Sequence, residues 1–267
     1  MTTPSGQQFA VVTGASSGIG YELAKQFAEH GFDLLVAAED DGIDAAARTL
    51  AGMGVATTSL QVDLATYEGV EQLYAEIKKI GRPLDAIAIN AGVGVGGDFT
   101  HQTELSDELN LISLNVISPV HLAKRVLKDM VARGQGRVLF TSSIAALMPG
   151  PFEAVYAASK AFVQSFSEAL RNELKDSGVT ITALQPGPTE TNFFHRAGLD
   201  DTKVGTSKKD DPAEVAKQGF EALMNGEDHV MAGSLKTKAQ AAMTNVLPAT
   251  ANAEQHRKMA EPGSGKK

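Results

Sequence analysis

The chain has 267 residues, of which 43% are hydrophobic and 21% are charged, a composition typical of one large globular domain or two small ones. Its net charge of −8 argues against nucleic acid or an anionic membrane surface as the main partner, because both attract basic patches. The absence of cysteine excludes disulfides and thiolate metal sites, and without a signal peptide or an apolar run of ~18 residues we expect a cytoplasmic protein with no membrane span.

From residue 9 onwards, short apolar runs alternate with helical patterns at the spacing of βαβ units. Strands are predicted at 9–13, 33–38, 56–62, 84–90, 137–142, 180–185 and 228–232, and helices at 18–30, 43–53, 67–79, 103–132, 154–176, 212–225 and 235–246. Most of the strands are continuously apolar, as strands covered on both faces must be. The sequence therefore predicts an α/β fold with a doubly wound, mostly parallel seven-stranded sheet of Rossmann type, in one domain over 1–248, followed by a polar, partly disordered tail over 249–267.

The first predicted strand runs into a glycine-rich turn, Gly14-Ala15-Ser16-Ser17-Gly18-Ile19-Gly20, and a helical pattern starts at once. Glycines at such a turn let the backbone approach a phosphate closely, and the amides at the start of the helix then face it. The turn therefore favours a dinucleotide site. The alternative is a tight strand-to-helix connection with no ligand.

Tyr156 and Lys160 lie four residues apart in a predicted helix, so they project from the same face. A phenol has an ordinary pKa of roughly 10, and a cation beside it favours the phenolate and lowers that value. Such a pair can act in acid-base catalysis. The alternative is that the two are only surface neighbours, with the lysine solvated and the tyrosine packed by its ring.

The spacing of the three glycines resembles the T-G-x-x-x-G-x-G turn of the short-chain dehydrogenase/reductase family, in its single-domain branch. Further residues match the family's motifs in the family's order: Asp63 and Leu64; Asn90, Ala91 and Gly92; Asn115; Ser143; Tyr156 and Lys160; and Pro186, Gly187, Thr189 and Thr191. The resemblance covers nearly the whole chain. The sequence departs from the family at Ile89, which replaces the first Asn of the N-N-A-G turn. Because that Asn helps to stabilise the central sheet in the family, the replacement raises the question of how Ile89 packs.

This resemblance implies an NAD(P)-dependent oxidoreductase that interconverts a carbonyl and a secondary alcohol. Tyr156 would be the general acid in reduction and the general base in oxidation, and Lys160 would lower its pKa and bond the nicotinamide ribose. Ser143 would donate a hydrogen bond to the substrate oxygen, and Asn115 would support a water that links Lys160 to solvent. Taken singly, Ser143 could instead be a helix N-cap and Asn115 a satisfied helix-interior residue.

The choice of cofactor depends on the end of the second strand, where residues 37–41 read Ala-Ala-Glu-Asp-Asp. Relatives that prefer NADP(H) usually carry Arg at the position of Glu39, and carboxylates there would repel a 2′-phosphate. We therefore expect NAD(H) to be favoured over NADP(H). The resemblance implies that Asp63 bonds the adenine amine and that residues 186–191 bond the nicotinamide carboxamide. The alternative is a solvated Glu39 with Arg48 reaching inward.

The partner implied by the resemblance is a small-molecule carbonyl or alcohol. Residues 191–211 would form a mobile lid, and Val93, Ala145, Phe152 and Phe194 would line a mainly apolar pocket. His195 on the lid is read as a surface or packing residue. A homodimer or homotetramer is expected, through an apolar helix face that includes Phe162, Phe166, Ala169 and Leu170.

Two other functions stay open. A noncatalytic dinucleotide-binding regulator would be expected to lose part of the Ser143, Tyr156 and Lys160 set, all of which is present. A sugar-nucleotide epimerase or dehydratase of the family's longer branch needs a further substrate domain and a T-G-x-x-G-x-x-G turn. The chain shows neither feature.

Overall fold

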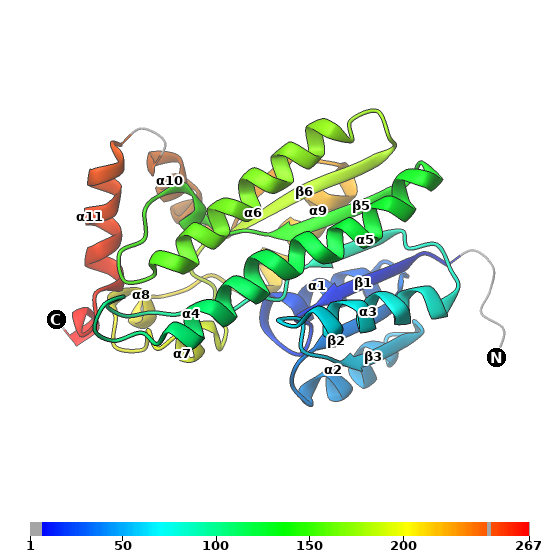
Figure 1. Cartoon of the computed structure of the whole chain (residues 1–267), viewed down its shortest axis with the longest axis horizontal. Coiled ribbons are helices and arrows are strands. Elements are labelled where there is room, and N and C mark those ends of the chain that lie inside the picture. Colours follow the sequence, from blue (N-terminus) through cyan, green and yellow to red (C-terminus); the bar gives the residue numbers. More distant parts are fainter. Residues whose placement is uncertain (1–6, 245–246, 267) are drawn as a thin grey trace.

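The computed structural model describes residues 7–244 and 247–266, and its centre is one seven-stranded parallel sheet (Figure 1). The strands are β1 Phe9–Thr13, β2 Asp33–Ala38, β3 Thr57–Gln61, β4 Ala86–Ile89, β5 Gly136–Thr141, β6 Val179–Pro186 and β7 His229–Ala232. Their order is β3-β2-β1-β4-β5-β6-β7, so the direction of winding reverses between β1 and β4. Ligands of such sheets bind beyond the carboxyl ends of the strands at this reversal point. The predicted fold class is confirmed.

Helices cover both faces of the sheet. One face packs against α1 Gly18–Glu29, α2 Gly42–Ala51 and α9 Pro212–Asn225, and the other packs against α3 Tyr67–Ile80, α5 Ser118–Arg133 and α6 Ala154–Glu173. On the first face the Phe27 and Phe220 rings meet edge to face, with centroids 5.1 Å apart. On the second, Phe140 and Phe166 do the same at 5.7 Å. Apolar helix stripes on both sides explain the continuously apolar strands.

The helix predicted over 103–132 is interrupted. Helix α4 Leu105–Ile112 leads into a π turn, Ser113–Ile117, and then into α5. Asn115 lies inside this turn and is buried. Because π turns widen the helix by one residue and change its carbonyl pairing, they often mark functional sites.

The last part of the chain is helical, and the prediction of a disordered tail is wrong for the described residues. After α10 Leu235–Thr244, helix α11 covers Ala249–Ala260 and a 3-10 turn covers Ser264–Lys266; residues 245–246 and 267 lie outside the described ranges. Only Asn252 and Ala260 of α11 are buried, so no apolar stripe announces this helix in the sequence. Polar contacts hold it instead: Asn252 Nδ2 donates to the Thr244 carbonyl at 2.8 Å.

The segment after β6 carries two short helices, α7 Phe193–Arg196 and α8 Lys203–Thr206. Within this segment, Phe194, Ala197 and Leu199 form a small buried cluster of their own. The C-terminal turn packs on the same segment: Gly265 N donates to the Asp201 carbonyl at 2.9 Å. In Figure 1, α11 accordingly stands at the same end of the molecule as α7 and α8.

Within the described residues, none of the helices has the length and apolar character that a membrane crossing needs.

Candidate active site

The glycine-rich turn joins β1 to α1 in a conformation that requires glycine. Gly14 and Gly18 have φ angles of 67° and 57°, in the left-handed region. A Cβ on Gly20 would lie 2.0 Å from the Gly14 carbonyl oxygen, so the turn folds tightly onto the start of the helix. Ser17 precedes α1 without capping it through its side chain, which leaves the first N–H groups of the helix available to an anion.

Asn90 ties the ends of three neighbouring strands together below this turn. Its Nδ2 donates to the Thr13 carbonyl of β1 at 3.1 Å, and its Oδ1 accepts from Thr141 Oγ1 of β5 at 2.9 Å. The preceding residue, Ile89, is buried in the apolar core on the α5 side. Ile89, which stands where the family has Asn, therefore packs in the core, while Asn90 makes the polar contacts that connect β1, β4 and β5.

A cavity of about 360 Å³ opens between the glycine turn, the ends of β4 and β5, and the segment after β6. Such a volume suits a small-molecule or cofactor site. It is lined by the residues predicted for cofactor binding and catalysis, except Asn115: Gly14, Ser16, Ser17, Gly18, Ile19, Gly20, Glu39, Asp63, Leu64, Asn90, Ala91, Gly92, Ser143, Tyr156, Lys160, Pro186, Gly187, Thr189 and Thr191. One site thus gathers residues from the whole length of the chain.

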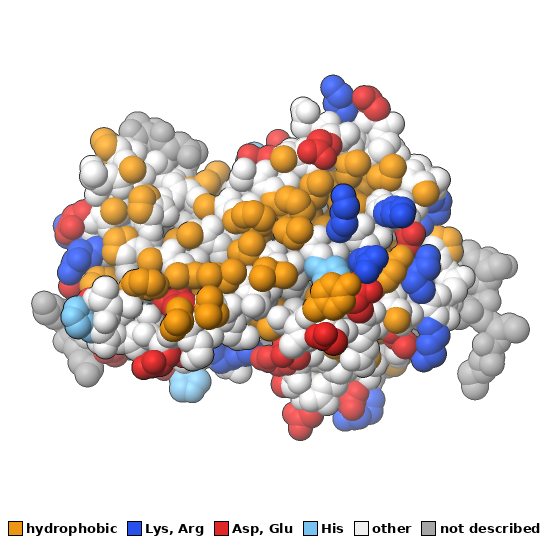
Figure 2. Space-filling model, in the orientation of Figure 1, with side chains coloured by type: hydrophobic (Ala, Val, Ile, Leu, Met, Phe, Trp, Pro, Cys, Tyr) orange, Lys and Arg blue, Asp and Glu red, His pale blue; other side chains and the backbone are white. Residues whose placement is uncertain are grey.

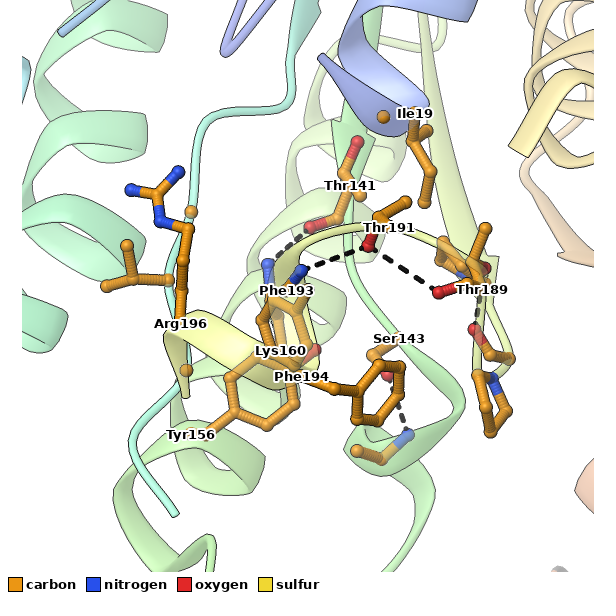
Figure 3. Close-up of a pocket in the computed structure, with 18 of the residues that line it drawn as sticks. Ile19, Thr141, Ser143, Tyr156, Lys160, Thr189, Thr191, Phe193, Phe194 and Arg196 are labelled. Carbon is orange, nitrogen blue, oxygen red and sulfur yellow. Dashed lines mark hydrogen bonds between the residues drawn. The ribbon is translucent and has the colours of Figure 1, made fainter. Parts of the chain in front are cut away.

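Tyr156 and Lys160 project from the first turns of α6 into this cavity (Figure 3). Lys160 Nζ lies 5.8 Å from the centre of the Tyr156 ring and donates to the Thr141 carbonyl at 2.9 Å. Burial lowers the pKa of Lys160 to about 8. The pair is therefore neither solvated on the surface nor sealed away from the cavity.

The pKa of Tyr156 is raised above its ordinary value, first by burial and then by the nearby Glu153 carboxylate. A hydrogen bond with Ser143 acts in the opposite direction and lowers it. The expected lowering of the Tyr156 pKa is thus not produced by the protein's own groups, because desolvation of the phenol is the largest effect. Near neutral pH the phenol keeps its proton.

Ser143 follows β5 and serves two purposes. Its Oγ accepts from Ala145 N at 3.0 Å, which caps the short 3-10 turn Ile144–Leu147. This bond uses an oxygen lone pair, so the hydroxyl proton is still available to a donor role in the cavity. The N-cap alternative and the catalytic interpretation are thus compatible.

Asn115 lies behind the cavity and holds the loop after β4. Its Oδ1 accepts from Val93 N at 3.0 Å, and its Nδ2 donates to the Val93 carbonyl at 2.8 Å and to Ser159 Oγ at 3.2 Å. A Cβ on Gly92 would lie 3.1 Å from Asn115 Oδ1 and 3.3 Å from Lys160 Nζ. Asn115 therefore positions the wall next to Lys160 without lining the cavity itself.

The segment after β6 closes over the glycine turn. Thr191 Cγ2 would be 3.0 Å from a Cβ on Gly18, and Thr191 Oγ1 accepts from Phe193 N at 3.2 Å (Figure 3). Phe193 then packs against the Tyr156 ring, with centroids 5.2 Å apart. This segment brings an aromatic side chain directly beside the phenol.

Comparison with known proteins decides the family. The profile described as short chain dehydrogenase matches residues 8–202. The chain belongs to the short-chain dehydrogenase family. It is 30% identical over 215 residues to the oxidoreductase UcpA of Salmonella typhimurium, with 80% of this chain and 79% of that protein covered.

Two solved structures are similar to this dehydrogenase over most of its length. A short-chain dehydrogenase from Sphingobium yanoikuyae in complex with NADPH has a TM-score of 0.80 and 30% identity, covering 90% of this chain and 92% of the other. A putative NAD(P) dependent gluconate 5-dehydrogenase from Beutenbergia cavernae with bound NADP has a TM-score of 0.72 and 26% identity, covering 84% and 94%. The chain is an NAD(P)-dependent oxidoreductase acting on CH–OH and C=O groups.

At the end of β2, it is Arg196 of this dehydrogenase that contacts Glu39, and not the Arg48 of the alternative prediction. Arg196 Nη2 donates to Glu39 Oε1 at 2.6 Å, and both side chains are half exposed, whereas Arg48 is exposed on the surface. The contact joins the end of β2 to α7 across 157 residues of sequence. His195 pairs with Asp200 at 2.8 Å and is 80% exposed, in agreement with its interpretation as a surface residue.

The predicted apolar lining needs one correction. Val93, Ala145 and Phe194 line the cavity of the dehydrogenase, but Phe152 is not among the lining residues. Its backbone has a positive φ of 66°, and its ring lies under the Arg257 guanidinium at 5.0 Å. The partner of Phe152 is thus on α11, a helix whose presence the sequence did not predict.

Helix α11 also supplies cavity residues that sequence reasoning missed, namely Gln255, His256, Met259 and Ala260, and Glu153 joins them from the start of α6. Burial raises the pKa of Glu153 to about 7 and lowers the pKa of His256. Glu153 lies three residues before Tyr156 and directly before the helix predicted over 154–176, which is a signal available in the sequence. His256 had no such signal, because α11 has no apolar periodicity.

Replacing Glu153 by Met is expected to stabilise the dehydrogenase, and more so at higher pH. The folded carboxyl holds its proton up to about pH 7, against 4.5 as the ordinary value, so its favourable contribution is complete below 4.5 and is lost as the pH rises through 7. The gain in the free energy of unfolding of Glu153→Met should therefore be larger at about pH 8 than at about pH 5, by roughly 2 kcal/mol.

Urea unfolding of both proteins at the two pH values measures this difference. The exposed Glu254 of α11 gives the matched control, because Glu254→Met removes a carboxylate without relieving a buried one. An equal gain for Glu153→Met at both pH values would contradict the prediction.

Proposed function

We propose that this protein reduces a carbonyl, and oxidises the corresponding secondary alcohol, by hydride transfer with Tyr156 as the general acid and base. The observation that carries the proposal is the convergence of three groups on one cavity: the Tyr156 phenol, the Ser143 hydroxyl that bonds it, and the buried Lys160 ammonium. A substrate oxygen there can accept two hydrogen bonds as charge builds on it.

The residues around the cavity fit a nicotinamide dinucleotide. The turn at Gly14, Gly18 and Gly20 leaves no room for side chains and directs the N–H groups of α1 toward the place of a pyrophosphate. Asp63 and Leu64 line the cavity and would contact the adenosine. Pro186, Gly187, Thr189 and Thr191 also line it and would contact the nicotinamide. When bound, the nicotinamide would supply or accept the hydride.

The direction of the pKa shift bears on the chemistry. Because burial and Glu153 keep the Tyr156 phenol protonated, the resting site is prepared to donate a proton, which suits carbonyl reduction. Ser143 would donate to the same oxygen and orient it. Lys160 would bind the ribose and return a proton to Tyr156, with Asn115 holding the wall beside the Lys160 ammonium.

The experiment that tests this function is a panel of ketones, aldehydes and secondary alcohols followed at the nicotinamide absorbance band. Turnover of at least one class, absent in the Tyr156→Phe variant, is expected. Cofactor binding without turnover anywhere on a broad panel would contradict it and favour the noncatalytic dinucleotide-binding regulator. That second function currently has no observation in its favour, since the full catalytic set is present.

We further propose that NAD(H) is preferred over NADP(H). The structures with NADPH and NADP show that similar proteins use the phosphorylated cofactor. In this chain, however, Glu39 and Asp40 line the cavity after β2, where the adenosine ribose would bind, and Arg196 already pairs with Glu39. A carboxylate accepts hydrogen bonds from ribose hydroxyls and repels a phosphate.

Glu39→Gln is therefore expected to lower kcat/KM for NADH by about tenfold and to narrow the preference over NADPH, because a charged hydrogen-bond acceptor is lost. Steady-state kinetics with each cofactor measures the effect. Asp41→Asn is the matched control, since Asp41 lies two residues after Glu39 and does not line the cavity. A clear NADPH preference of the wild-type protein would refute the argument from carboxylates.

We also propose that the protein forms a homodimer or homotetramer through the face covered by α4, α5 and α6. Figure 2 shows a band of hydrophobic side chains across this face. Leu105, Leu109, Ile117 and Phe162 are large apolar residues exposed there. A contiguous apolar surface of this kind marks an interaction site.

Sedimentation velocity at micromolar concentration is expected to show a dimer or tetramer. The double variant Leu109→Glu and Phe162→Glu should shift it to monomer, because charges placed on a buried apolar face are costly. The control variant Lys258→Glu, at the exposed lysine of α11, makes no such change. A wild-type protein that sediments only as a monomer would contradict this proposal.

A further inference from the structure

One wall of the cavity carries two ionisable side chains to which the proposed chemistry assigns no contact with the substrate. Glu153 lies at the start of α6 and His256 lies on α11, and both line the cavity. Their side chains are only 8% and 12% exposed, and Glu153 Oε2 is 3.4 Å from His256 Nε2. Residues separated by about a hundred positions are thus brought together inside the site.

The Glu153 carboxylate is not used to stabilise its own helix. It occupies the N-cap position of α6, where a side chain normally accepts from the first N–H groups, but it makes no such bond. Among the described residues, His256 is the ionic partner of this carboxylate, at a distance longer than a good hydrogen bond. A buried carboxylate in this state needs a further donor, which the cavity can provide.

The geometry of His256 fixes what the pair can offer. His256 Nδ1 lies 3.1 Å from the Pro151 carbonyl, and because a carbonyl oxygen only accepts, Nδ1 carries a proton. In neutral His256 the Nε2 lone pair therefore faces Glu153, and the two groups share one added proton. With that proton the pair is neutral overall and presents both a donor and an acceptor.

We propose that Glu153 and His256 bind a hydroxyl group of the substrate while Ser143 and Tyr156 hold the reacting carbonyl. A hydroxyl donates and accepts at once, as the pair does, and its oxygen can bridge groups that stand 3.4 Å apart. The inference rests on the proposed function and narrows the substrate class to hydroxyketones and the corresponding diols.

The remaining walls define the rest of such a molecule. Val93, Met148, Phe193 and Met259 line the cavity with apolar or sulfur-containing side chains. The part of the substrate between its two oxygens is therefore a hydrocarbon chain or ring. Since α11 provides both His256 and Met259, the C-terminal helix helps to determine which substrates fit.

The test compares linear 2-alkanones with ω-hydroxy-2-alkanones of matched and increasing chain length. At the best length, kcat/KM of the wild-type protein should favour the hydroxyketone by about 100-fold or more, because a site with buried polar groups rejects an analogue that leaves them unpaired. Glu153→Met and His256→Phe should each reduce this ratio to below about tenfold, chiefly by raising KM for the hydroxyketone.

Two matched controls separate this role from a structural one. Glu254 lies on the exposed side of α11, and His195 lies on the exposed part of α7. Neither Glu254→Met nor His195→Phe should therefore change the ratio of kcat/KM for the hydroxyketone to that for the alkanone. Circular dichroism and the Kd for NADH, measured by fluorescence, confirm that each variant is folded and binds the cofactor.

Each outcome is decisive. Turnover of ketones with no preference for the hydroxyl overturns the inference but leaves the proposed function standing. A preference that survives both Glu153→Met and His256→Phe also overturns it, because the hydroxyl is then bound elsewhere. Preference for an ω-aminoketone over the hydroxyketone overturns the hydroxyl assignment. No turnover of any carbonyl overturns both proposals, and loss of the preference in both variants supports the inference.

Discussion

Tyr156→Phe is expected to lower kcat by a factor of about 10³, the size of effect associated with a positioned general acid. The substitution removes only the hydroxyl, and the ring keeps its packing against Phe193. Without the phenol, proton transfer to the substrate oxygen has no direct donor apart from the weaker Ser143 hydroxyl. Stopped-flow measurement of nicotinamide oxidation, at saturating cofactor and substrate, gives the rate of this step.

The Kd for cofactor should change little in Tyr156→Phe, which separates loss of chemistry from loss of binding. Tyr67→Phe is the matched control, because Tyr67 begins α3 on the exposed surface and is not a cavity residue. If Tyr156→Phe kept more than about a tenth of the wild-type rate, the role of general acid would have to be given to another group.

Gly20→Ala is expected to cause the largest loss of cofactor binding among single methyl additions. The new Cβ would lie 2.0 Å from the Gly14 carbonyl oxygen and 2.5 Å from Asn90 Nδ2, so the turn and the polar connection beneath it must both move. Overpacking of this kind costs about 3 kcal/mol of stability. Affinity for NADH should fall by at least about tenfold, because the N–H groups of α1 no longer face the pyrophosphate.

Urea unfolding and fluorescence titration with NADH measure the two effects. Gly52→Ala is the control, since Gly52 ends α2 with a helical φ of −61° and its nearest contact to an added Cβ is the Thr49 carbonyl at 3.2 Å. Unchanged NADH affinity in a folded Gly20→Ala protein would show that the glycine turn is not where the cofactor binds.

Local patterns were sufficient to predict the sheet, the glycine turn and the Tyr156 and Lys160 pair, and the family resemblance added most of the other cavity residues outside α11. Continuous apolar runs specify strands that are covered on both faces, and the glycine turn and Asn90 follow directly after two of these strands. Tyr156 and Lys160 needed only helical spacing. These features depend on neighbours within a few residues, which is why they can be read from the chain.

Features that depend on contacts between distant segments could not be predicted in this way. The Glu39 to Arg196 ion pair joins two loops that are adjacent only after the sheet has formed. Likewise, α11 is held by polar contacts and not by an apolar stripe, so its sequence resembles that of a tail. The raised pKa of Tyr156 has the same origin, since the burial that causes it comes from the whole fold.

The anchoring of the C-terminal turn has a practical consequence for handling the protein. Ser264 Oγ accepts from Lys203 N at 2.9 Å, and Gly263 N donates to Asp201 at 2.9 Å, so the final residues rest on the segment that closes the cavity. The amino end of β1 lies at the opposite end of the molecule (Figure 1). Purification tags and surface-immobilisation linkers therefore belong at the N-terminus, where they leave the access route of substrates undisturbed.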